Sequence, residues 1–193
     1  SEMQSALVEL TQRTGLRACG PNCEGYYNAL GRIATTFSPT VETKDDDART
    51  LISDRRIGVI AQSGGMGFAL FNRGKAAGIG FSYVISTGNE ADLSAGEIAD
   101  MLVDDPDTDA ILLFLETIRR PDLFERAARR AHAAGKPIVA YKLGRSEAAA
   151  KLATTHTGAL AGSDAAADAF FRAVGIVRVD QLEALLEIPP LLL

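Results

Sequence analysis

One of the chain's two histidines, His156, lies in a run of small and hydroxyl-bearing residues that extends from Thr154 to Asp164. Imidazole has an unperturbed pKa near neutrality, so much of it is uncharged at physiological pH and can act as a nitrogen nucleophile. The small neighbours leave room for a bulky group, and a helix predicted just after the run would offer free N–H groups to an anion. The run therefore predicts a histidine that carries a phosphoryl group, with Thr157 and Gly158 helping to wrap the phosphate.

The plainer interpretation is a histidine that only hydrogen-bonds a loop, and for an arbitrary histidine that interpretation is the better one. The context of His156 favours phosphate binding, because a polar run ending in glycine is poor material for a core. His132 serves as an internal comparison: it lies among basic neighbours on a predicted helix, and we assign it no function.

A second candidate is the turn formed by Gln62, Ser63, Gly64 and Gly65, directly after a predicted strand over residues 57–61. Glycines at such a turn let backbone N–H groups face an anion at the start of the following helix. Many α/β domains need a glycine-rich turn only for packing. The turn lacks the lysine of a P-loop and the full spacing of a dinucleotide fingerprint. It therefore favours a site for one phosphoryl group over a nucleotide site.

A third candidate is Glu116, which ends the predicted apolar strand over residues 110–115. A carboxylate at this edge could accept a hydrogen bond from one imidazole nitrogen and leave the other nitrogen free to attack phosphorus. The alternative is a solvated glutamate that pairs with Arg119 or Arg120. The residues alone leave both interpretations open.

Charged residues also follow the next predicted strand, at Lys142, Arg145 and Glu147. They either shape the loop that leads to His156 or form a charged surface turn. The sequence does not decide between these two interpretations.

Short apolar runs alternate with helical patterns over the region that must position these residues. The predicted strands cover residues 57–61, 81–86, 110–115, 137–141 and 174–179, and the predicted helices cover residues 67–77, 95–103, 121–134 and 180–186. Such alternation predicts an α/β domain, a parallel sheet with helices on both faces. Ligands bind such sheets at the carboxyl ends of the strands, where the candidate residues lie.

The first fifty residues follow a different pattern. A helix is predicted over residues 4–14, a strand over 16–19 and a tight loop over 20–23, and a charged bridge follows over residues 44–54. We expect residues 1–50 to be the tail of another domain, 51–188 to be the main domain, and 189–193 to begin a linker.

Composition excludes several classes of protein. Hydrophobic residues make up 47% of the chain and charged residues 23%, as is usual for a globular protein. The net charge of −5 argues against nucleic acid as a general partner. The sequence contains neither a bilayer-spanning apolar run nor a signal peptide. Cys19 and Cys23 have a spacing that matches no common zinc or redox motif, so we expect a reduced, cytoplasmic protein without a membrane partner or a metal site.

Six segments, in order, resemble the NDP-forming acyl-CoA synthetases, which are relatives of the succinyl-CoA synthetase alpha subunit. The resemblance covers nearly the whole chain. It is carried by GPNCEG at residues 20–25, IGVIAQSGGMG at 57–67, STGNEADLS at 86–94, DDPDTDAILLFLE at 104–116, GKPIVAYKLGRSE at 135–147 and THTGALAGSD at 155–164.

The resemblance implies a flavodoxin-like, three-layer parallel sheet preceded by the tail of a Rossmann-like CoA-binding domain. It also implies a reaction in which acyl-CoA, phosphate and ADP are interconverted with the free acid, CoA and ATP through an acyl phosphate. His156 would carry the phosphoryl group and Glu116 would orient its ring, while the turn from Gln62 to Gly65 would hold the phosphate.

Further residues and partners follow from the same resemblance. Asn22 and Cys23 would lie near the acyl thioester, and Thr155 stands where a common form of the motif has serine, which keeps the hydroxyl. The expected partners are an ATP-grasp domain or subunit that binds Mg²⁺ with the nucleotide, the preceding CoA-binding domain, a small acyl substrate and further copies in an oligomer. We expect the chain alone to be unable to complete the reaction.

Two other functions are weighed against this one. The first is a non-catalytic acyl-CoA-sensing module fused to an acetyltransferase, although in such fusions the position of His156 often holds a residue that cannot be phosphorylated. The second is a receiver-type phosphoaspartate switch, which fits poorly because the first predicted strand ends without the acidic pair that such a site needs for magnesium.

Overall fold

The computed structural model describes residues 2–41, 55–144 and 164–193. Its first part contains helix α1 (Glu2–Thr14), strands β1 (Gly25–Asn28) and β2 (Ile33–Thr36) and a 3-10 turn, η1 (Pro39–Val41). The second part contains β3 (Arg56–Ala61), α2 (Gly64–Ala76), β4 (Gly80–Ser86), α3 (Ala95–Asp104), β5 (Ala110–Leu115), α4 (Pro121–Ala133) and β6 (Ile138–Lys142). The third contains α6 (Asp164–Val174), β7 (Val177–Val179), α7 (Ala184–Glu187) and α8 (Pro189–Leu192).

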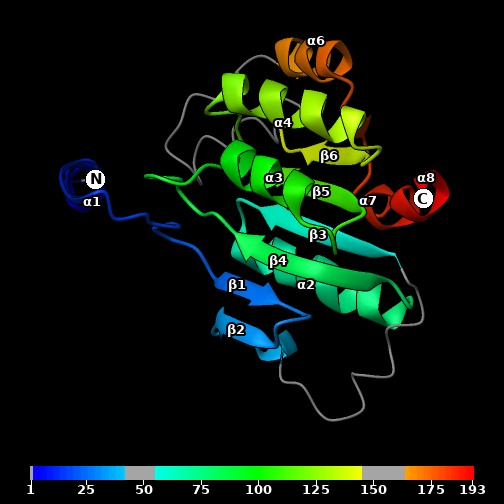
Figure 1. Cartoon of the computed structure of the whole chain (residues 1–193), viewed down its shortest axis with the longest axis horizontal. Helices are drawn as coiled ribbons and strands as arrows, with labels where there is room; N and C mark the ends of the chain where they lie inside the picture. Colours follow the sequence, from blue (N-terminus) through cyan, green and yellow to red (C-terminus); the bar gives the residue numbers. More distant parts are fainter. Residues whose placement is uncertain (1, 42–54, 145–163) are drawn as a thin grey trace.

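The strands form one seven-stranded sheet in the order β2-β1-β4-β3-β5-β6-β7 (Figure 1). The five strands from β4 to β7 in this order are parallel to one another. Successive connections run from β3 outward to β4 and then back across to β5, so the strand order reverses beside β3. In doubly wound sheets such a reversal opens a crevice beyond the carboxyl ends of the strands. The predicted α/β class is confirmed.

Two antiparallel strands at one edge were not predicted. Tyr26 of β1 pairs with Ile85 of β4, and β2 then pairs antiparallel with β1. Both strands are only four residues long and carry no apolar run, so periodicity gives no signal for them. The sheet is therefore mixed rather than wholly parallel, and residues 25–36 are hydrogen-bonded to the same sheet as the main domain.

The predicted strand over residues 16–19 is wrong. The backbone N–H of Ala18 donates to the carboxylate of Asp92, and the carbonyl of Ala18 accepts from the N–H of Leu93. Arg17 also pairs with Asp92 and with Glu97. The two contacts of Ala18 with the loop before α3 satisfy its main-chain groups without a sheet partner.

The core has two halves because strand side chains alternate between the faces of the sheet. In β5, Ile111, Leu113 and Leu115 pack with α3, α4 and α6, whereas Leu112 and Phe114 pack with α2 and α7. All six residues of β5 are buried. The packing of β5 on both faces fixes where the strand ends, and Glu116 is the residue that follows it.

The helix boundaries differ from prediction in ways that bear on the site. Helix α2 begins at Gly64 instead of residue 67, so the glycine-rich turn is the helix's own first turn. Strand β7 begins at Val177 because α6 continues to Val174, and α7 is capped by Glu183 instead of Asp180. Residues 189–192 form a helical turn. Of the helices described, none is both long and apolar enough to cross a bilayer.

Candidate functional site

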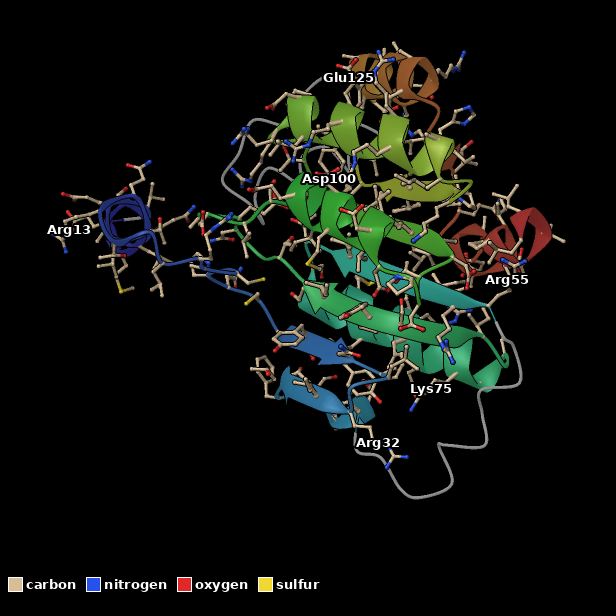
Figure 2. The ribbon with its side chains drawn as sticks, in the orientation of Figure 1. Arg13, Arg32, Arg55, Lys75, Asp100 and Glu125 are labelled. Atoms are coloured by element: carbon tan, nitrogen blue, oxygen red, sulfur yellow. The ribbon has the colours of Figure 1, made fainter. Side chains whose placement is uncertain are left out.

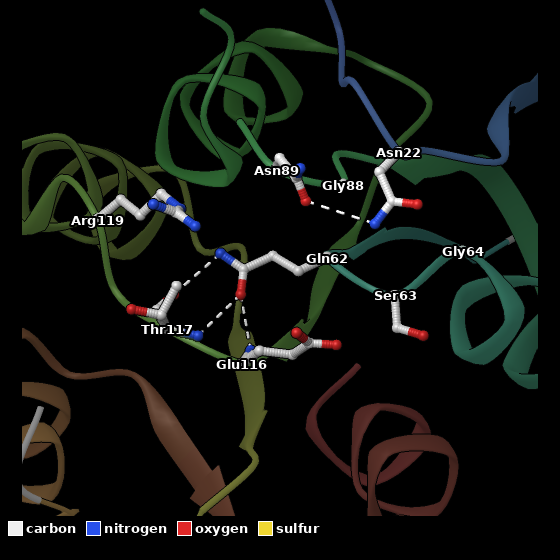
Figure 3. Close-up of a pocket in the computed structure, with 9 residues that line it drawn as sticks. All are labelled: Asn22, Gln62, Ser63, Gly64, Gly88, Asn89, Glu116, Thr117 and Arg119. Atoms are coloured by element: carbon white, nitrogen blue, oxygen red, sulfur yellow. Dashed lines mark hydrogen bonds between the residues drawn. The ribbon is translucent and has the colours of Figure 1, made fainter. Parts of the chain in front are cut away.

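A cavity of about 180 Å³ lies beyond the carboxyl ends of β3, β4 and β5, where the strand order reverses (Figure 3). The turns after these three strands and the loop before β1 each contribute to its wall. The lining residues are Asn22, Gln62, Ser63, Gly64, Gly88, Asn89, Glu116, Thr117 and Arg119. The structure thus brings the turn after β3, Glu116 and Asn22 together at one cavity.

Gln62 fixes the relative positions of two of these turns. Its side-chain Oε1 accepts hydrogen bonds from the backbone N–H groups of Glu116 at 2.7 Å and Thr117 at 2.9 Å. Its Nε2 donates to the carbonyl of Thr117 at 2.9 Å and to Oε1 of Glu90 at 2.8 Å. Figure 3 shows the amide of Gln62 lying against the turn after β5.

Gln62 was expected to contact a phosphate, but its side-chain amide hydrogen-bonds other groups of the protein instead. Both of its amide donors are already used within the protein, and the side chain is only 6% exposed. Its amide therefore holds the backbone from which Glu116 projects. The phosphate contact expected from residues 62–65 stays a prediction for Ser63, Gly64 and Gly65.

The first turn of α2 provides donors for an anion. Ser63 is the N-cap residue, and its hydroxyl makes no capping hydrogen bond. The first N–H groups of a helix have no partner within it and carry the positive end of the helix dipole. Close packing requires glycine at position 64, because a Cβ there would lie 2.4 Å from Cβ of Glu24. At Gly65 a Cβ would have no neighbour within 4 Å.

A second carboxylate, Glu90, joins the connection between β4 and α3 to the turn after β3 and was not singled out from the sequence. Its Oε1 accepts from Nε2 of Gln62, from the hydroxyl of Thr87 at 3.0 Å and from the N–H of Ala95 at 3.2 Å. Its Oε2 is buried without a hydrogen-bond partner among the described residues. Burial raises the pKa of Glu90, although these hydrogen bonds and the charge of Arg119 oppose the rise.

The loop over residues 20–23 is held against the loop after β4. The N–H of Asn89 donates to the carbonyl of Pro21, and that of Ala91 donates to the carbonyl of Gly20, both at 2.8 Å. The side-chain amide of Asn22 donates to Oδ1 of Asn89 at 3.4 Å. These contacts explain how Asn22, from a distant part of the sequence, reaches the cavity wall.

The two cysteines lie just outside the cavity. The thiol of Cys23 donates to the carbonyl of Cys19 at 3.5 Å, and that of Cys19 donates to the carbonyl of Ser86 at 3.3 Å. Although Cys19 is exposed as a residue, desolvation of its partly buried thiol, with smaller contributions from Cys23 and Glu90, raises its pKa to about 11. Cys19 is therefore held as a thiol at neutral pH.

Several predicted residues cannot be compared with the structure. His156, Thr157, Gly158, Arg145 and Glu147 lie outside the described residues, so the roles assigned to them stay predictions.

Lys142, the last residue of β6, can be compared. It is only 5% exposed, its Nζ donates to the carbonyl of Leu143, and burial lowers its pKa. The interpretation of Lys142 as part of a charged surface turn is therefore wrong.

The site also contains residues that sequence reasoning missed. Gly88, Asn89 and Thr117 line the cavity; Gly88 and Asn89 lie within a segment that carries the family resemblance, and Thr117 directly follows another. Arg119 lines it too, whereas Arg120 turns away and pairs with Asp122 at 3.1 Å. Within the described ranges, no group of three His, Cys, Asp or Glu side chains is placed to hold a metal ion.

Comparison with protein families identifies the domain. The model of the succinyl-CoA ligase-like flavodoxin domain matches residues 54–192. The chain belongs to this family. The matched region contains β3, α2 and β5, the elements that carry Gln62, the glycine-rich helix start and Glu116.

Relatives of this succinyl-CoA ligase-like domain are much longer acyl-CoA ligases. The chain is 38% identical over 186 residues to a trans-feruloyl-CoA synthase of an unknown prokaryotic organism, covering 96% of this chain and 26% of that protein. It is 36% identical over 193 residues to the ADP-forming acetate–CoA ligase I of Archaeoglobus fulgidus, covering 100% of this chain and 27% of that protein. The chain thus spans about a quarter of these curated relatives.

A solved structure agrees with the assignment of the fold. The dinucleotide-forming acetyl-coenzyme A synthetase 1 of Candidatus Korarchaeum cryptofilum, in complex with phosphate and ADP, superposes with a TM-score of 0.86 at 33% identity. The match covers 100% of this chain and 39% of that chain. The flavodoxin-like class expected from the sequence is therefore confirmed.

Proposed function

We propose that this chain is part of an NDP-forming acyl-CoA synthetase and carries the histidine that relays a phosphoryl group between an acyl phosphate and a nucleoside diphosphate. The observation that carries the proposal is the cavity beside β3. It combines a helix start whose first N–H groups can face an anion with a carboxylate whose backbone is hydrogen-bonded to Gln62, in a domain whose longer relatives include ADP-forming acyl-CoA ligases.

His156 would be the phosphorylated residue. In the transfer, an imidazole nitrogen attacks phosphorus of the acyl phosphate, an N–P bond forms, and the P–O bond to the acyl group breaks. The free carboxylate leaves with the electron pair of that bond. Glu116 would accept a hydrogen bond from the other ring nitrogen, which fixes the tautomer and stabilises the positive charge that develops on the ring.

The phosphoryl group would be held between the start of α2 and the loop that carries His156. Ser63, Gly64 and Gly65 provide a hydroxyl and backbone N–H groups at the helix N-terminus, and Thr157 and Gly158 would close around the other side. Gln62 would contribute by fixing the turn after β5 through its two bonds to backbone N–H groups.

The remaining parts of the reaction would require partners. Asn22 and Cys23 would lie near the acyl thioester, as part of a CoA-binding domain whose tail is residues 1–50 and whose last strands join the edge of this sheet. An ATP-grasp domain or subunit would bind ADP or ATP with Mg²⁺ and receive the phosphoryl group. The acyl group would be a small molecule and the assembly an oligomer located in the cytoplasm, with CoA and phosphate as further substrates. The chain alone would be inactive.

The proposal is tested by phosphorylating the full-length protein, together with its ATP-grasp partner, with γ-labelled ATP and Mg²⁺. We expect an acid-labile, base-stable label in the wild type and in His132→Ala, and none in His156→Ala. His132 is a matched control because it is the only other histidine and lies exposed on α4. Label that persists in His156→Ala contradicts the assignment. Failure to label the wild type would instead favour a non-catalytic, acyl-CoA-sensing module.

A further inference from the structure

Arg119 is distinguished from the other residues of the cavity by its charge. Of the nine residues in the lining, it alone carries a positive charge. It follows β5 by four residues, in the turn that Gln62 holds in place through Glu116 and Thr117. Figure 3 shows its side chain across the cavity from Ser63 and Gly64.

The neighbouring arginines all have carboxylate partners, whereas Arg119 has none among the described residues. The ion pairs nearby are Arg120 with Asp122, Arg126 with Asp100, Arg129 with Glu125, and Arg130 with Asp100 and Asp104. Two other described arginines also lack an ion pair, Arg13 on α1 and Arg32 before β2 (Figure 2). All three are exposed, but Arg119 differs from the other two because it lines the cavity. Among the described residues, Arg119 thus lines the cavity without a direct ion pair, although its charge acts on the buried carboxyl of Glu90.

The charges around the cavity are otherwise negative. Glu116 is part of the wall, Glu90 lies behind Gln62, and the carboxylate of Glu24 packs beside Gly64. A phosphoryl dianion entering this cavity would meet these carboxylates. Coulombic repulsion would weaken its binding unless a cation lies within reach.

Guanidinium chemistry matches a phosphoryl ligand. Arginine stays protonated throughout the physiological range, and its planar fork can donate two parallel hydrogen bonds to phosphate oxygens. The donors at the start of α2 lie on the opposite side of the cavity, so an anion between them would be held from two sides. Glu116 would then be left to hold the imidazole.

We propose that Arg119 binds the phosphoryl group of the substrate in this cavity and supplies the positive charge that the binding requires. The inference rests on the proposed function and adds a phosphate-binding residue to it. The ligand class is inorganic phosphate or the phosphoryl end of an acyl phosphate.

The test uses Arg119→Gln and Arg119→Lys, with Arg120→Gln as the matched control. Arg120 is the adjacent residue, carries the same charge, and is already paired with Asp122 outside the cavity. Binding of inorganic phosphate to the full-length protein is measured by calorimetry at low ionic strength. Removal of a charge-assisted hydrogen bond should weaken binding about tenfold in Arg119→Gln and less in Arg119→Lys, because lysine keeps the charge but loses the fork. Arg120→Gln should stay within about twofold of the wild type.

Two results would overturn the inference. The first is a phosphate affinity of Arg119→Gln within about twofold of the wild type. The second is an equal loss of phosphate affinity in Arg119→Gln and Arg120→Gln, which would indicate a general effect of net charge. Labelling of the wild type by γ-labelled ATP, measured in parallel, separates the two proposals. If the wild type is labelled but Arg119→Gln binds phosphate normally, only the role of Arg119 is wrong.

Discussion

The amide of Gln62 should contribute measurably to both stability and catalysis, and Gln62→Leu is the variant that tests this. Leucine has nearly the same volume as glutamine, so the substitution removes hydrogen bonds without opening a large cavity. It removes the partners of the N–H groups of Glu116 and Thr117, of the carbonyl of Thr117, and one of the donors to Glu90.

The magnitude follows from these contacts. Each such hydrogen bond contributes about 1 kcal/mol net, and leaving buried partners unsatisfied costs more, so the loss should be roughly 4 kcal/mol. For a chain of this size that corresponds to a fall in Tm of about 10 °C. Because the turn that carries Glu116 also loses its anchor, labelling of the protein by γ-labelled ATP should slow as well.

The assay is thermal unfolding followed by circular dichroism, with Gln12→Leu as the control. Gln12 is exposed on α1, so its replacement should change Tm little. If Gln62→Leu unfolds at the same temperature as Gln12→Leu, the amide of Gln62 does not hold the turn in the way described.

Three further substitutions test other parts of the site. Gly64→Ala should destabilise the protein by about 2 kcal/mol, because its Cβ would lie 3.1 Å from the backbone N of Glu24 as well as against that side chain. Gly65→Ala, which meets nothing within 4 Å, should leave stability unchanged or raise it by up to about 1 kcal/mol, and chemical denaturation should reveal the difference. Glu90→Gln tests the buried carboxyl, whose raised pKa means that its contribution to stability is present at low pH and lost as pH rises through that pKa. Relative to Glu90→Gln, the wild type should therefore lose stability as pH rises above the ordinary pKa of a glutamate, about 4.3, and a constant difference between the two proteins would contradict this.

The sequence was sufficient for the parts of the fold that depend on long apolar segments. Strand β5 is a continuous apolar run, so both its existence and the position of Glu116 at its end could be predicted. The glycine-rich turn after β3 was recognisable because it directly follows a short apolar strand. Its use as the first turn of α2 was not, because the glycines at 64 and 65 have low intrinsic helix propensity and the packing of Gly64 against Glu24 overrides that preference.

The parts that could not be predicted depend on contacts between distant segments. Strand β1 is short, and its place in the sheet is set by pairing with β4, more than fifty residues later. Glu90 has a φ of 53° and reaches Gln62 only in that left-handed conformation of its loop. Likewise, Arg119 and Arg120 are identical in type and adjacent in sequence. Only the direction of the turn after β5 assigns one to the cavity and the other to Asp122.

The most direct test of the phosphoryl relay is a chase experiment on the phosphorylated full-length protein. The protein is labelled with γ-labelled ATP and Mg²⁺ in the presence of its ATP-grasp partner and freed of nucleotide. It is then offered either ADP or, as a first acyl substrate, acetate with CoA. ADP should remove the label from His156 as ATP, and a competent acid with CoA should release it as inorganic phosphate. Label that stays on the protein after ADP is added would contradict the account.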